Sequence, residues 1–138
     1  MEGRSFDDLE VGQAAETAKT VTEADVTLFA GITGDFNPAH VDEEAARRGR
    51  FGGRIAHGML TAGLVSAVLG TRLPGPGCIY VGQSLRFTRP VRIGDTVTAR
   101  VEVTELRPEG RRVILATTCR NQEGETVLEG EAEVMVPA

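Results

Sequence analysis

Apolar and polar positions alternate with a period of two along the second half of the chain. From Thr96 to Leu106, valines and an alanine alternate with threonine, arginine and glutamate, which makes one face of a strand apolar. Turn signals at Gly94-Asp95, Glu109-Gly110 and Glu123-Gly124 separate runs of this kind, and such short connections favour an antiparallel sheet. Gly82, inside the first run, indicates a β-bulge. The predicted strands are Ile79–Phe87, Thr96–Leu106, Val113–Asn121 and Thr126–Val136.

The first half of the chain follows a helical pattern after a short leading strand, which we predict from Val11 to Val21. Thr22 is a suitable N-cap for a helix that ends at Gly34, because threonine accepts a backbone hydrogen bond and glycine tolerates left-handed geometry. Asp42 is a suitable N-cap for a shorter helix over Glu43–Arg48, which has acidic residues at its start and arginines at its end.

A third helix is predicted from Gly58 to Gly70, and none of its sides carries a charge. The uncharged stretch around it, Ile55 to Thr71, is about as long as the shortest membrane spans. Its glycines, threonines and histidine indicate a buried helix of a globular protein instead. A helix that is apolar all round is expected to be surrounded by protein. We therefore predict an α+β fold, a single domain over residues 1–138 with an antiparallel sheet wrapped around this central helix.

Composition narrows the class of protein. Of 138 residues, 41% are hydrophobic and 25% are charged, as in ordinary globular proteins, and the net charge of −5 argues against a nucleic-acid partner. The first residues lack the apolar run of a signal peptide. Cys78 and Cys119 follow neither metal-binding nor redox spacing. We expect a cytoplasmic protein without a membrane partner.

Candidate chemistry lies in the run from Asp35 to His40, which contains a carboxylate and an imidazole five positions apart. In a helix these side chains would lie about 140° apart around the axis and could not converge. Gly34 and Pro38 predict a non-helical turn instead, in which both side chains face one pocket. Together they form a candidate acid/base pair that operates near neutral pH.

Structural interpretations stand beside the catalytic one. Asp35 is about as well suited to capping N–H groups of the turn, and His40 to a place on the surface. Asn37, before a proline, is typical of turns, and His57 is more readily explained as a brace for the loop before the central helix. A metal site formed by Asp35, His40, Asp42 and His57 matches no recognised ligand spacing.

Gly58 is a third candidate site residue, because it could supply a hydrogen-bond donor. Hydration of a carbon–carbon double bond conjugated to a thioester needs a base, an acid and hydrogen-bond donors for the enolate oxygen. The N-terminus of a buried helix offers free backbone N–H groups, and a glycine there lets a ligand carbonyl approach closely.

At this point the residues resemble a known family. The run from Phe29 to His40 is similar to the signature of the MaoC-like (R)-specific enoyl-CoA hydratases, and so are Ala56–Leu60 and Tyr80–Phe87. The resemblance implies a hot-dog fold, in which an antiparallel sheet curls around a central helix. It also implies assembly into homodimers or dimers of dimers.

The resemblance further implies roles for individual residues. Asp35 and His40 would be catalytic and would hold one water for syn addition across a trans-2-enoyl thioester. The Gly58 N–H would contribute to the oxyanion site, and Asn37 would hold the catalytic loop. The substrate would be an acyl-CoA or an acyl-carrier-protein thioester. No cofactor and no metal are expected, since CoA is part of the substrate.

Two other functions fit the same fold. A hot-dog thioesterase would release free CoA thiol, and a non-catalytic subunit would only bind acyl thioesters. The Asp-x-Asn-Pro-x-His run favours hydration over the thioesterase, and an intact Asp35/His40 pair counts against a purely binding role.

Overall fold

A computed structural model describes residues 2–138, and Met1, which the predicted domain includes, lies outside the described residues. Five strands form one antiparallel sheet in the order β1-β3-β4-β5-β2. The strands are β1 (Ala14–Thr20), β2 (Ile79–Phe87), β3 (Thr96–Arg107), β4 (Arg112–Arg120) and β5 (Thr126–Met135). The helices are α1 (Glu23–Thr33), α2 (Pro38–Val41), α3 (Glu43–Arg47) and α4 (Gly58–Thr71), with short 3-10 turns at Phe6–Asp8 and Glu109–Arg111.

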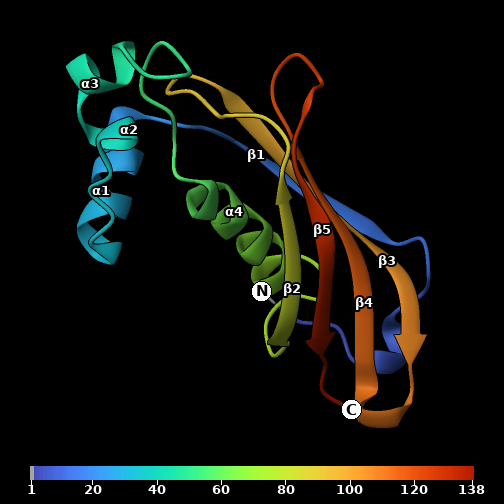
Figure 1. Ribbon diagram of the computed structural model, residues 1–138. Coiled ribbons are helices and arrows are strands. Elements are labelled where there is room, and N and C mark those ends of the chain that lie inside the picture. Colours follow the sequence, from blue (N-terminus) through green and yellow to red (C-terminus); the bar gives the residue numbers. More distant parts are fainter. Residues whose placement is uncertain (1) are drawn as a thin grey trace.

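The sheet curves around one side of α4, as Figure 1 shows, and the predicted antiparallel arrangement is confirmed. The alternation of β3 points its apolar positions inward, where Val97, Ala99, Val101 and Val103 are completely buried. The register of β2 against β5 shifts between Tyr80 and Gly82, at the predicted bulge. The core therefore lies between the inner face of the sheet and α4.

The predicted caps set the ends of the short helices. Thr22 and Asp25 form a capping box at the start of α1, and Gly34 ends that helix at φ 80°. Asp42 Oδ1 accepts a hydrogen bond from the Ala45 N–H at 3.0 Å and caps α3. In Figure 1 the helices α1, α2 and α3 are grouped away from the sheet, on the side where the chain enters α4.

The prediction that the Asp35–His40 segment is entirely non-helical is wrong. Pro38 begins α2, with Asn37 as its N-cap, and the Asn37 side chain accepts a hydrogen bond from the Ala39 N–H at 3.1 Å. A proline at the first helical position costs nothing there, because the N–H it lacks would have no partner within the helix. His40 therefore lies on a short helix, and only the residues before Pro38 form the turn.

The prediction that α4 is surrounded within the chain is also wrong. Its inner side is buried against the sheet, but Met59 on its outer side is 55% exposed, and Ser66 and Ala67 are exposed as well. Tyr80 and Val81 of β2 continue this uncharged surface. The absence of charge on α4 thus reflects two different faces, one in the core and one uncovered.

Among residues 2–138, no helix is both long enough and apolar enough to cross a membrane.

Two glycines of the first helix provide a matched test of its end. Gly31 lies inside α1 and Gly34 follows it at φ 80°, and a Cβ at either position would meet no atom within 4 Å. We expect Gly34→Ala to lower the free energy of unfolding by about 1 kcal/mol, because the left-handed backbone disfavours a side chain. Gly31→Ala should raise it by about 0.5–1 kcal/mol. Urea denaturation, followed by circular dichroism, measures the free energy of unfolding of both variants. Changes of the same sign in the two variants would contradict the role of Gly34 as the C-cap of α1.

Candidate active site

Asp35, His40 and His57 meet at one place although three different elements supply them. Asp35 follows the end of α1, His40 lies on α2, and His57 immediately precedes α4. One side-chain donor or acceptor atom of each residue lies within 4.8 Å of those of the other two. The structure thus brings the two sequence candidates together and adds His57 to them, whereas their catalytic roles stay predictions.

His40 is held in one orientation by a backbone carbonyl. Its Nδ1 lies 2.7 Å from the Ile55 carbonyl oxygen, which can only accept a hydrogen bond, so Nδ1 carries the proton. The other ring nitrogen, Nε2, is left as the acceptor in the neutral ring. His40 is 9% exposed, so its interpretation as a surface histidine is wrong. The imidazole is therefore buried and has a defined tautomer.

Asp35 has a turn-forming role and still has a free oxygen to offer. Its Oδ1 accepts a hydrogen bond from the Asn37 N–H at 3.2 Å, and its own N–H donates to Thr33 Oγ1 at 3.2 Å. The interpretation of Asp35 as a cap for N–H groups of the turn therefore accounts for one of its two carboxylate oxygens, Oδ1. The side chain is exposed to the cavity, and the second oxygen, Oδ2, is available to a ligand.

His57 braces both candidate groups. Its ring stacks on that of His40, with centroids 4.0 Å apart, and contacts Phe29 on α1. Its Nε2 lies 3.0 Å from the backbone carbonyl oxygen of Asp35, so this nitrogen carries the proton. His57 is 2% exposed, and its Nδ1 is buried without a partner among the described residues. The neutral tautomers of the two histidines are therefore opposite.

Gly58 opens α4 at the wall of the same cavity, which has a volume of about 1230 Å³. The first N–H groups of a helix have no partner within it, so they are available to a ligand oxygen. A Cβ at Gly58 would lie 2.8 Å from Cε1 of Phe87, on β2. A side chain here would therefore displace the ring of Phe87, a contact that the sequence did not reveal.

Thr61 is a cavity residue that the sequence pattern missed. It lies one helical turn after His57, it is 2% exposed, and its Oγ1 has no partner among the described residues. The sequence signal that could have identified Thr61 is its position four residues after His57, since residues four apart share one face of a helix. Phe87, Arg50 and Arg89 also line the cavity, from β2 and from loops.

The cluster of Asp35, His40 and His57 has the composition of a metal site but not its geometry. Asp42, the fourth member of the sequence-based metal hypothesis, caps α3 instead. The ring planes of His40 and His57 differ by only 29°. Because the lone pairs of imidazole lie in the ring plane, stacked rings direct them along nearly parallel planes and not toward one ion. The arrangement suits proton transfer better than coordination.

Comparisons with known proteins give the chain its relatives. Residues 8–125 match the family model of the MaoC like domain. The chain is 62% identical over 133 residues to an (R)-specific enoyl-CoA hydratase of Rhodospirillum rubrum, covering 96% of this chain and 92% of that one. It is 58% identical over 132 residues to a 3-hydroxybutyryl-CoA dehydratase of Methylorubrum extorquens, covering 96% and 83%.

A solved structure is also similar. The unliganded R-hydratase PhaJ1 from Pseudomonas aeruginosa aligns with a TM-score of 0.93 at 50% identity, covering 98% of this chain and 86% of that one. The predicted α+β hot-dog architecture is confirmed by this likeness and by the sheet itself.

The opposite tautomers of the two histidines can be observed directly. We expect neutral His40 to carry its proton on Nδ1 and neutral His57 on Nε2, because each of these nitrogens faces a carbonyl oxygen. Long-range ¹H–¹⁵N NMR spectra of imidazole-labelled protein above about pH 8, where free imidazole is neutral, distinguish the two forms. His40→Gln and His57→Gln assign the signals. The same tautomer for both rings would contradict the geometry.

Proposed function

Because this chain belongs to the family of MaoC-like domains, we propose that it is an (R)-specific enoyl-CoA hydratase and, in reverse, a 3-hydroxyacyl-thioester dehydratase. The observation that supports this most directly is the convergence of Asp35 and His40 at the cavity that Gly58 also lines. Relatives of the chain carry the names of the forward and the reverse reaction.

The proposed reaction adds one water across a trans-2-enoyl thioester. Asp35 and Nε2 of His40 hold the water between them. Its oxygen forms a bond to the β-carbon while one of the two groups takes its proton. The α-carbon receives a proton from the pair on the same face, so addition is syn and the product is the (R)-3-hydroxyacyl thioester. We assign the two roles to the pair as a whole, since both groups contact the same water in this proposal.

Gly58 has a separate role in this proposal. Attack at the β-carbon moves negative charge onto the thioester oxygen, and the Gly58 N–H at the positive end of α4 donates a hydrogen bond to it. Removal of one such donor typically costs about a hundredfold to a thousandfold in rate. Asn37 supports the loop through the cap of α2, and His57 supports it through the Asp35 carbonyl.

The absence of a cofactor or metal is part of the proposal. The stacked rings of His40 and His57 support it, because their lone pairs do not converge. An acyl-CoA and an acyl-carrier-protein thioester both carry the reacting group, and rates over a chain-length series of the two would identify the preferred carrier. A cytoplasmic location remains the expectation drawn from the sequence.

We expect Asp35→Asn and His40→Ala each to lower kcat by a hundredfold or more, because each removes a group that transfers a proton. The assay follows loss of enoyl absorbance of crotonyl-CoA in the presence of EDTA, which also tests independence from metal. Asp42→Asn is the matched control, since the Asp42 side chain caps α3 and asparagine caps a helix as well as aspartate.

Full activity in both Asp35→Asn and His40→Ala would refute the assignment. Release of free CoA thiol in place of hydration would identify a thioesterase. Binding of crotonyl-CoA without turnover by the wild type would indicate a purely binding subunit.

We further propose that a second copy of the chain covers the outer side of α4. Met59, Tyr80 and Val81 are exposed there, and β2 is an edge strand with unpaired backbone groups. The opposite edge, β1, carries the charged residues Glu16 and Lys19, which discourage pairing. A symmetric dimer through β2 and α4 would bury the uncharged surface.

One matched pair of substitutions tests the dimer. We expect Val81→Lys to convert the protein to a monomer, because it places a charge in the buried interface. Val11→Lys changes an equally apolar residue, 62% exposed before β1, and should leave the dimer intact. Sedimentation velocity measures both, and a wild-type monomer at micromolar concentration would refute the proposal.

A further inference from the structure

The segment from Arg54 to Gly58 supplies most of the fixed atoms of the site. The Ile55 carbonyl orients His40, the His57 ring stacks on His40, and Gly58 begins α4. Any shift of this short segment relative to α2 would move the carbonyl that holds the His40 ring. The contacts that fix the segment therefore matter for the acid/base pair.

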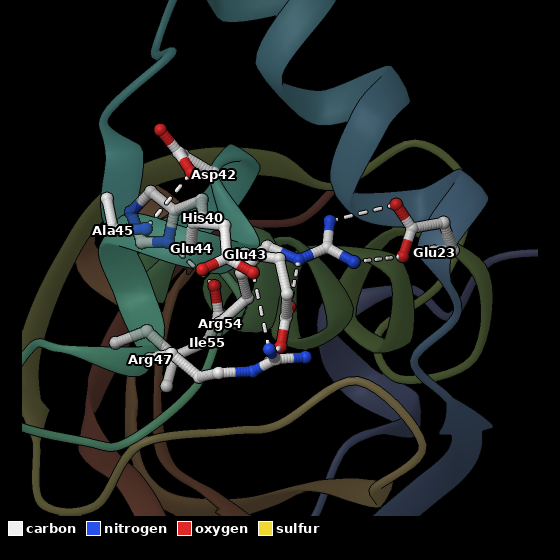
Figure 2. A network of polar contacts seen from close by, with 9 residues as sticks. All are labelled: Glu23, His40, Asp42, Glu43, Glu44, Ala45, Arg47, Arg54 and Ile55. Atoms are coloured by element: carbon white, nitrogen blue, oxygen red, sulfur yellow. Dashed lines mark hydrogen bonds and ion pairs between the residues drawn. The ribbon is translucent and has the colours of Figure 1, made fainter.

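Arg54 fixes the segment to two helices at once, as Figure 2 shows. Its Nη1 and Nη2 donate to the two carboxylate oxygens of Glu23 at 2.8 and 2.5 Å, and its Nε donates to Glu43 Oε2 at 2.8 Å. Glu23 is the first residue of α1 and Glu43 the first of α3. The Arg54 side chain is 17% exposed, whereas those of Glu23 and Glu43 are 60% and 47% exposed. The bidentate geometry on Glu23, with a second carboxylate at Nε, distinguishes this contact from an ordinary surface ion pair.

The two acids and the guanidinium reinforce each other. Hydrogen bonds to Glu23 and Glu43 raise the pKa of Arg54, and the hydrogen bond from Arg54 lowers the pKa of Glu23. Arg54 and Glu23 therefore stay charged at neutral pH. Each acid also lies in the first turn of its helix, where negative charge is favourable.

The position of these helices explains why the hydrogen bonds of Arg54 matter for His40. Helices α1 and α3 flank α2 in the chain, and α2 carries His40. The backbone of α2 meets the same segment, because the Ile55 N–H donates to the Ala39 carbonyl at 3.1 Å. Arg54 thus joins the elements before and after α2 to the residue that holds the His40 ring, as Figure 2 illustrates.

We propose that Arg54 is a positioning residue for His40: by clamping Glu23 and Glu43 it fixes the Ile55 carbonyl, and through that carbonyl the tautomer and direction of the catalytic imidazole. Arg54 is absent from the residues that line the cavity, so it acts through its neighbours and not on the substrate. The effect on rate rests on the proposed hydratase function, whereas the effect on the His40 tautomer does not.

Arg54→Gln and Arg54→Lys test this role. Glutamine has no charge, and lysine keeps the charge but cannot hold two carboxylates in a planar fork. We expect kcat on crotonyl-CoA to fall about tenfold to a hundredfold in both, since small misplacements of a catalytic group are costly. KM should change less than about twofold because binding contacts remain. The His40 ¹⁵N signals should show a mixture of tautomers.

Arg47→Gln is the control. Arg47 also pairs with Glu43, and with Glu44, but its side chain is 61% exposed and it makes no contact with the Arg54–Gly58 segment among its ion pairs. We expect wild-type kcat and a single His40 tautomer in this variant. Thermal melting of every variant verifies that the protein is folded at the assay temperature.

Two results would overturn the proposal. One is a folded Arg54→Gln protein with wild-type kcat and an unchanged His40 tautomer. The other is a lower kcat with the His40 tautomer unchanged, which would show a merely structural role. If Arg54→Gln does not fold, Glu43→Gln replaces it with the same expected NMR signature. If the wild type hydrates no thioester, the hydratase assignment fails, but the tautomer measurement still decides the role of Arg54.

Discussion

The packing of α4 against the inner face of the sheet is the constraint on which the rest of the structure depends. Leu69, Val65 and Val68 are almost completely buried there, opposite strand positions that are also fully buried. Burial of a side chain of this size contributes about 1.5–3 kcal/mol, so the helix has one favourable position on the sheet. Once α4 is fixed, its first residue is fixed too, and with it Gly58 and the neighbouring His57.

Hydrogen bonds to backbone carbonyls connect the start of α4 to the less buried residues of the site and fix the positions of these residues too. His57 donates to the carbonyl of Asp35, and His40 donates to the carbonyl of Ile55. Each bond joins the segment before α4 to the α1–α3 region, whose helices lie to one side of the sheet in Figure 1. The hydrogen bonds of Arg54 to Glu23 and Glu43 also join the segment before α4 to the α1–α3 region, outside the cavity lining.

Much of this arrangement follows from local sequence rules, and the rest depends on contacts between distant residues. The strands, the caps at Thr22 and Asp42 and the stop at Gly34 are predictable because each depends on residues within a few positions. The start of α2 was missed because Pro38 can either end a helix or begin one, and only the cap by Asn37 decides. The open side of α4 was missed because a buried core and an uncovered face have the same apolar composition. The pairing of Arg54 with Glu23, far away in the chain, leaves no local pattern.

The use of carbonyls to hold both histidines has a chemical consequence. A carboxylate partner would orient an imidazole equally well, but it would place a second carboxylate beside the rings in addition to that of Asp35. A carbonyl fixes the tautomer with a partial charge only. In the proposed reaction a proton leaves the water and a proton is delivered to carbon, and a fixed tautomer keeps Nε2 of His40 available for this transfer. The charged hydrogen bonds of Arg54 lie outside the cavity lining, where they hold the framework without entering the proton transfer.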